Sequence, residues 1–87
     1  MKVVAKPIEV ISVTDIKGTI TPIRFKLIND DESNQVIKID KVIDRSLEKL
    51  AGNNMIIFSC QTLSGNIEKR FELKYELGTC KWMLFKI

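Results

Sequence analysis

The segment that decides the fold is Ile67–Ile87, with the sequence IEKRFELKYELGTCKWMLFKI. Apolar and charged residues alternate over Phe71–Leu77, which is the pattern of a β-strand with one buried side and one solvent-facing side. Gly78 and Thr79 follow as turn residues, and a second apolar-rich run occupies Cys80–Lys86. This segment therefore predicts a β-hairpin.

The rest of the chain also consists of short apolar runs separated by turn residues. Ser46–Gly52 differs, because its serine is a good N-cap and its glycine a good C-terminal residue, so we expect a short helical turn near residues 46–51. Pro22 has no N–H, so its nitrogen should lie at an edge or a bulge. Strands are expected over Ile8–Val13, Thr19–Ile28, Val36–Ile43, Met55–Leu63, Ile67–Leu77 and Cys80–Lys86.

These elements predict a single all-β domain over residues 1–87. We expect a small six-stranded antiparallel meander that forms a barrel or a strongly curled sheet, because closure protects the edges of such apolar strands. An open sheet with the helical turn over one end is the alternative.

The turns at residues 65–66 and 78–79 fix the pairing of the last three strands. A two-residue loop at 78–79 places Tyr75 opposite Trp82, and one at 65–66 places Cys60 opposite Phe71. The predicted inner face then consists of Ile56, Phe58, Cys60, Phe71, Leu73, Tyr75, Leu77, Cys80, Trp82 and Leu84.

The same register bears on the two cysteines. Cys60 and Cys80 are separated along the strand Ile67–Leu77 by roughly 20 Å, at a rise of ~3.3 Å per residue. A disulfide needs Cα atoms within roughly 7 Å of each other. We therefore expect two free, buried thiols.

The outer face of these strands combines charged and apolar side chains. Met55 and Ile57 on one side, and Met83 and Phe85 on the other, flank the charged strand, with Lys74 between Ile57 and Met83. These four apolar residues, the apolar stripe, form the candidate interaction surface. Either the stems of lysine and arginine side chains or the N-terminal segment cover it in part, or a partner protein does, in which case a second copy of the chain is favoured.

A second candidate surface is basic. If the strands on either side of residues 29–35 pair across that loop, Lys26 lies near Lys38 and Arg24 near Asp40. Binding of single-stranded nucleic acid is therefore the alternative function, although the expected inward position of the aromatic residues removes the usual stacking platform. The net charge of +3 is also small for such a role. The candidate basic patch consists of Arg24, Lys26, Lys38 and Lys41.

Residues suited to catalysis are scarce. The chain has no histidine, which removes the commonest general base and the commonest zinc ligand. Two separated cysteines cannot form a four-ligand zinc site, and no phosphate-binding glycine motif is present. The carboxylates Asp30–Glu32 are expected in a solvated loop. We expect no catalytic residue, metal or cofactor, and an enzyme without histidine is the least favoured alternative.

Features of the whole chain bear on its cellular location. No apolar run approaches the roughly 20 residues that a bilayer requires, and residues 1–7 lack the apolar core of a signal peptide. Two cysteines without an export signal are typical of a cytoplasmic protein. The sequence thus predicts a small cytoplasmic protein without a membrane segment, which binds another protein or associates with itself.

Overall fold

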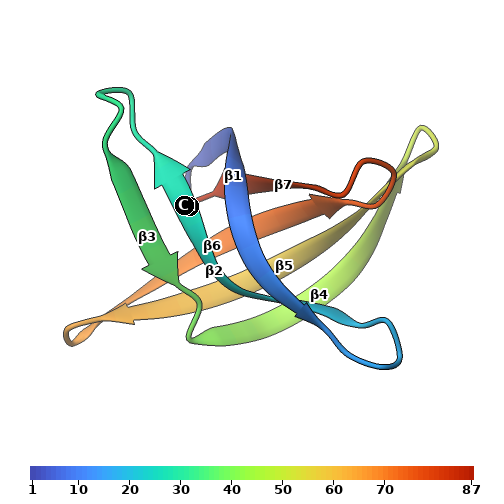
Figure 1. Ribbon diagram of the computed structural model, residues 1–87, viewed down its shortest axis with the longest axis horizontal. Helices are drawn as coiled ribbons and strands as arrows, with labels where there is room; N and C mark the ends of the chain where they lie inside the picture. The colour runs from blue at the N-terminus through green and yellow to red at the C-terminus, as the bar shows by residue number, and fades with distance from the viewer.

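The computed structural model describes all residues, 1–87, and they form one antiparallel β-sheet with no helix (Figure 1). The order of strands across the sheet is β3-β2-β1-β7-β6-β5-β4. The predicted all-β antiparallel fold is confirmed, with seven strands where six were expected. The strands are β1 (Val3–Thr14), β2 (Ile20–Ile28), β3 (Asn34–Lys38), β4 (Lys41–Leu50), β5 (Asn53–Ser64), β6 (Ile67–Glu76) and β7 (Lys81–Lys86).

The helical turn predicted near residues 46–51 is wrong. Ser46 lies inside β4, which pairs with β5 as far as Leu50 opposite Asn53. Ala51 and Gly52 have φ angles of 49° and 80°, so they form the two-residue hairpin turn whose central residues both need positive φ. Ser46 and Gly52 could have capped a helix of only one or two turns, and a helix that short is not stable without tertiary contacts. Pairing with β5 satisfies the same backbone groups.

The expected third strand, Val36–Ile43, is divided in two by a corner. The Ile39 N–H donates to the Ile23 carbonyl of β2 at 2.9 Å, and the Asp40 N–H donates to the Gln61 carbonyl of β5, also at 2.9 Å. The chain thus changes partner strands at this corner. The sheet curls strongly (Figure 1), but β3 and β4 remain its two edges, so it does not close into a barrel.

β1 is shared between the two parts of the sheet. Its first half pairs with β7 and its second half with β2. The β1–β2 register shifts beside Pro22, because Ile11 lies opposite Arg24 whereas Ser12 lies opposite Pro22. The predicted bulge near this proline is confirmed, and Pro22 lies in the part of β2 that β3 does not cover, so the strand has only β1 as a neighbour there.

The predicted register of the last three strands is confirmed, since Tyr75 faces Trp82 and Cys60 faces Phe71. The β6–β7 connection is longer than expected, however, so Leu77 and Cys80 lie in the turn and are exposed instead of facing inward. The β6–β7 ladder ends at Glu76 opposite Lys81, so four residues and not two form the connection. Cys80 takes a φ of 60°, and its N–H donates to the carbonyl of Glu76 at 2.8 Å.

The core lies inside the curl, between the three N-terminal strands and the four C-terminal ones. The rings of Phe25 on β2 and Phe71 on β6 meet edge to face with centroids 5.3 Å apart, which joins the two parts. Tyr75 and Trp82 pack with centroids 4.7 Å apart. The buried apolar residues are Phe25, Leu27, Ile39, Phe58, Cys60, Phe71, Leu73, Trp82 and Leu84.

Arg45 joins the two sides of the curl where the strands do not pair. β3 covers only Arg24–Ile28 of β2, so the start of β2 has a free edge. From β4, the Arg45 Nη1 donates to the Ile20 carbonyl at 2.9 Å and Nη2 donates to the Thr21 hydroxyl oxygen at 3.1 Å. The guanidinium carbon lies 5.3 Å from the centroid of the Phe58 ring. No helix capable of crossing a membrane occurs in this structure.

Candidate functional site

The apolar stripe lies on the outer face of β5–β7, as the register requires. Lys74 of β6 is flanked by Ile57 of β5 and Met83 of β7. Its ammonium group lies 3.8 Å from the centroid of the Phe85 ring and 3.1 Å from the Glu48 Oε1 of β4. The Lys74 side chain is only 12% exposed. The expected partial cover by a lysine stem is therefore present, and the stripe residues are half-buried.

A hollow of about 240 Å³ remains beside this lysine. Pro7 of β1 lies opposite Met83, so the apolar surface extends from β5 across β6 and β7 to β1. An apolar recess of this kind can receive a side chain from another molecule. The hollow is lined by Pro7, Met55, Lys74, Glu76, Lys81, Trp82 and Met83.

The charges around the apolar stripe balance. Lys86 lies 3.9 Å from Glu72, and Lys81 is opposite Glu76 across β6 and β7. Together with the pair between Lys74 and Glu48, three cations and three carboxylates surround the apolar residues. This face therefore has no net charge and would not repel a copy of itself.

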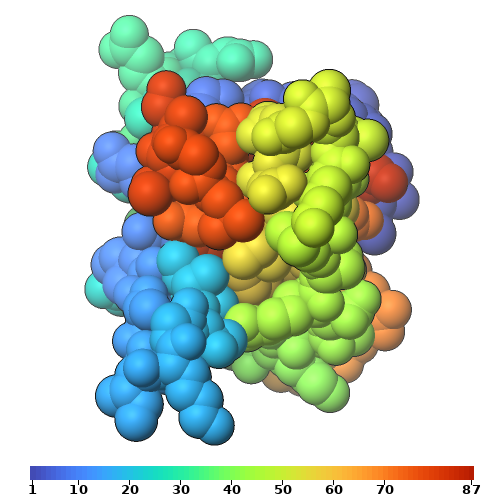
Figure 2. Space-filling view, turned by 90° about the vertical axis from the view of Figure 1, so that its right-hand side faces the viewer, coloured from blue at the N-terminus to red at the C-terminus, as the bar shows by residue number.

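Glu76 also connects two turns at one end of the sheet. Figure 2 shows the orange-red β6–β7 turn beside the yellow-green β4–β5 turn. Hydrogen bonds from the Thr79 hydroxyl and, at 2.9 Å, from the Asn53 side-chain amide hold the pKa of the Glu76 carboxyl below its ordinary value of 4.5. The Leu77 N–H donates to the Asn54 carbonyl at 3.1 Å.

The candidate basic patch forms with a register different from the expected one. The loop closes at Asn29–Ser33, two residues shorter, so Arg24 lies opposite Lys38 and Lys26 opposite Val36. The predicted neighbours, Lys26 with Lys38 and Arg24 with Asp40, are therefore wrong. Arg24, Lys26 and Lys38 do share the outer face of β2 and β3, whereas Lys41 lies beyond the corner and pairs with Gln61 of β5.

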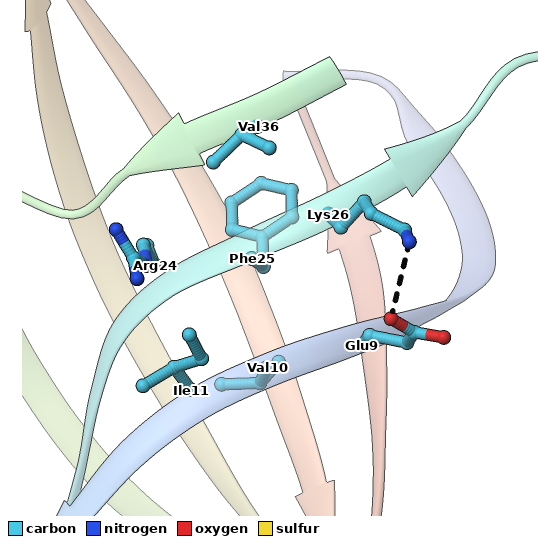
Figure 3. Close-up of a pocket in the computed structure, with 7 residues that line it drawn as sticks. All are labelled: Glu9, Val10, Ile11, Arg24, Phe25, Lys26 and Val36. Carbon is cyan, nitrogen blue, oxygen red and sulfur yellow. Dashed lines mark ion pairs between the residues drawn. The ribbon is translucent and has the colours of Figure 1, made fainter. Parts of the chain in front are cut away.

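Acidic residues partly neutralise this patch. Lys26 lies 3.5 Å from Glu9, and Lys38 lies 3.8 Å from Asp40. A hollow of about 360 Å³ lies beside the first of these pairs, and Figure 3 shows the pair of Lys26 and Glu9 at one end and Arg24 at the other. Its only aromatic residue, Phe25, is 1% exposed, so a base could not stack on its ring. The hollow is lined by Glu9, Val10, Ile11, Arg24, Phe25, Lys26 and Val36.

The side chains that could bind a metal or act in catalysis do not cluster in this structure. No group of three or more His, Cys, Asp or Glu residues is placed to hold a metal ion. Both cysteines are free, as expected, but only Cys60 is buried. Burial raises the pKa of the Cys60 thiol to about 12. Cys80 is exposed because it lies in the longer turn, which corrects the expectation of two buried thiols.

The sequence did not predict a groove between β3 and the β5–β6 hairpin, with a volume of about 410 Å³. It exists because β3 and β4 separate at the corner, and the run Val36–Ile43 contains no glycine or proline that would have marked this break. The groove is lined by Gln35–Lys38 of β3, by Thr62–Ser64 of β5, by Lys69 and Phe71 of β6 and by Ile87.

Comparisons of the chain with protein-family models, with curated proteins and with solved structures found no match.

Proposed function

We propose that this chain is a small, non-catalytic protein-interaction module that associates with a second copy of itself through the outer face of β5–β7. The observation that carries the proposal is the apolar stripe, four apolar side chains around one lysine, beside a hollow with mainly apolar walls. Methionine and phenylalanine are enriched in the cores of protein interfaces.

The position of the stripe supports binding in preference to a role in the core. The inner side of the same strands already packs the core through Phe58, Leu73 and Leu84. The stripe residues belong to the opposite side of the sheet, where the side chains of Lys74 and Lys86 cover Phe85 in part. Burying the rest of this apolar surface favours association by roughly 25 cal/mol per Å² before the costs of ordering are subtracted.

A second copy fits this face better than it fits the basic patch. A two-fold axis brings the same surface of both molecules together, so each charge meets the charges of an identical face. Around the apolar stripe, cations and carboxylates are equal in number and interspersed, and Lys81 or Lys86 of one copy can pair with Glu72 or Glu76 of the other. On β2 and β3, Arg24 already lies opposite a lysine, so self-association there would add like charges.

Light scattering over a concentration series tests the proposal. The wild-type chain should be dimeric, and Phe85→Glu should be a folded monomer, because the new carboxylate lies near the ammonium groups of Lys74 and Lys86. Val13→Glu is the matched control, since it places the same charge on an exposed apolar position outside the stripe. A wild-type monomer at high concentration, or equal loss of the dimer in both variants, would refute the proposal.

A further inference from the structure

The open side of the sheet lies between β3 and the end of β5. β3 is an edge strand, and Figure 1 shows it at the margin of the sheet with β2 as its neighbour. β4 begins at Lys41 opposite Gln61, so Thr62–Ser64 at the end of β5 have no β4 partner. The groove of about 410 Å³ therefore lies between β3 and the end of β5, where no other strand of this chain pairs with either of them on the groove side.

The backbone of β3 has hydrogen-bonding groups that face this groove. The Ile39 N–H donates to Ile23 of β2, and the Asn29 N–H donates to Ser33, at the two ends of the β2–β3 ladder. Residues of an antiparallel pair alternate between bonding to the partner and pointing away from it. Gln35 and Ile37 therefore bond to β2, and the N–H and C=O groups of Val36 and Lys38 point away from β2.

On the β5 side of the groove, a side chain from another part of the protein accepts the hydrogen bonds. The Leu63 N–H donates to the Asp40 Oδ2 at 2.7 Å, and the Thr62 hydroxyl donates to the same oxygen at 3.3 Å. A side-chain carboxylate thus occupies the place that a carbonyl of a neighbouring strand would take. The free N–H groups that remain at the groove belong to β3.

The side chains of the groove determine what it could accept. Ile37 of β3 is half-buried, and Leu63 and Ile87 provide exposed apolar surface, 55% and 42% exposed, at the other walls. Lys38 and Lys69 are the charged side chains among the lining residues; Asp40 beside the β5 wall lies 3.8 Å from Lys38, whereas Lys69 has no ion-pair partner. An occupant that matches these walls is extended, partly apolar and acidic.

We propose that this groove binds an acidic, extended peptide segment of a partner protein, which pairs with β3 as an additional strand. Five residues of β3 offer a ladder of roughly 17 Å, enough for a short peptide. Apolar side chains of the peptide contact Ile37 and Leu63, and its carboxylates pair with Lys38 and Lys69. This peptide site is independent of the proposed self-association, because none of its lining residues belongs to the apolar stripe.

Titration of ¹⁵N-labelled protein with the peptide acetyl-EVEVEV-amide tests this site. The amide signals of Val36 and Lys38 should shift, and the basic peptide acetyl-KVKVKV-amide should bind at least about tenfold more weakly, because two ammonium groups line the groove. The proposal is overturned if the acidic peptide shifts no β3 signals, if both peptides bind equally, or if oligo-dT binds the same amides more tightly than the peptide.

Two variants distinguish backbone pairing from simple charge attraction. Val36→Pro removes an N–H that points away from β2, so the β2–β3 ladder should persist while affinity for acetyl-EVEVEV-amide falls about fivefold. Val36→Ala retains the N–H and should bind as the wild type does. Equal affinity of the folded Val36→Pro variant would contradict strand pairing. If that variant does not fold, Lys38→Glu combined with Lys69→Glu provides the test, and unchanged affinity would again refute the proposal.

Discussion

The Arg45 Nη1 lies 2.9 Å from the carbonyl oxygen of Ile20, which precedes it by 25 residues in the chain. This bond joins β4, one edge of the sheet, to the part of β2 that the short strand β3 leaves uncovered. A side chain here replaces the backbone ladder that would close a barrel. The curl of the sheet therefore depends in part on one guanidinium group.

Removal of this group should loosen the curl. Arg45→Ala loses two hydrogen bonds and the contact with the Phe58 ring, so the free energy of unfolding should fall by about 1–2 kcal/mol in urea denaturation. Lys49→Ala is the matched control, because this exposed cation of the same strand makes no hydrogen bond or ion pair through its side chain. An equal loss of stability in both variants would show that the Arg45 contacts contribute nothing.

The two cysteines should differ sharply in reactivity. Cys80 is exposed, whereas Cys60 is buried and its pKa is raised to about 12, so only Cys80 has an accessible thiol in the folded protein. Alkylation followed by mass spectrometry should find one modified cysteine in the native protein and two after denaturation. Rapid modification of Cys60 in the folded state would contradict its position in the core.

The hydrogen bonds to Glu76 should make stability sensitive to acid. Because the folded state holds the pKa of this carboxyl below 4.5, its contribution is complete above that value and is lost as the pH falls through the folded pKa. Glu76→Gln should therefore lose less thermal stability than the wild type between about pH 5 and about pH 3. Glu68→Gln replaces an exposed carboxylate whose side chain makes no hydrogen bond or ion pair, and its acid sensitivity should match the wild type.

The basic patch should not bind single-stranded nucleic acid with useful affinity. Its hollow has no exposed ring, and Glu9 and Asp40 lie beside two of its cations. Fluorescence anisotropy with labelled oligo-dT at low salt should show no binding by the wild type. A complex that weakens steeply with added salt, and that Arg24→Ala or Lys38→Ala abolishes, would favour the nucleic-acid alternative.

The local sequence was sufficient for features that depend on alternation within a strand. The pattern over Phe71–Leu77 predicted which side chains face inward, and the pairing of Tyr75 with Trp82 followed from the turn between them. Alternation works here because a one-residue slip would expose the whole buried side of the strand.

Features that depend on distant parts of the chain could not be predicted from the sequence. The strand over Ser46–Leu50 resembles a capped helix locally, and only pairing with β5 decides its structure. The division of Val36–Ile43 arises at Ile39 and Asp40, whose backbones bond to two different strands. The stripe on β5 and β7 was predicted from register, whereas the groove beside β3 exists only because the sheet stays open.

The three methionines allow the most direct test of self-association. Met55 and Met83 belong to the apolar stripe, whereas Met1 is 70% exposed at the chain end and serves as an internal control. Isotope-filtered NMR of a mixture of ¹³C-methyl-methionine-labelled and unlabelled protein detects contacts between copies. We predict intermolecular NOEs at the methyl groups of Met55 and Met83 and none at Met1. Intermolecular NOEs that avoid Met55 and Met83, or none at a concentration well above that of the light-scattering series, would contradict this prediction.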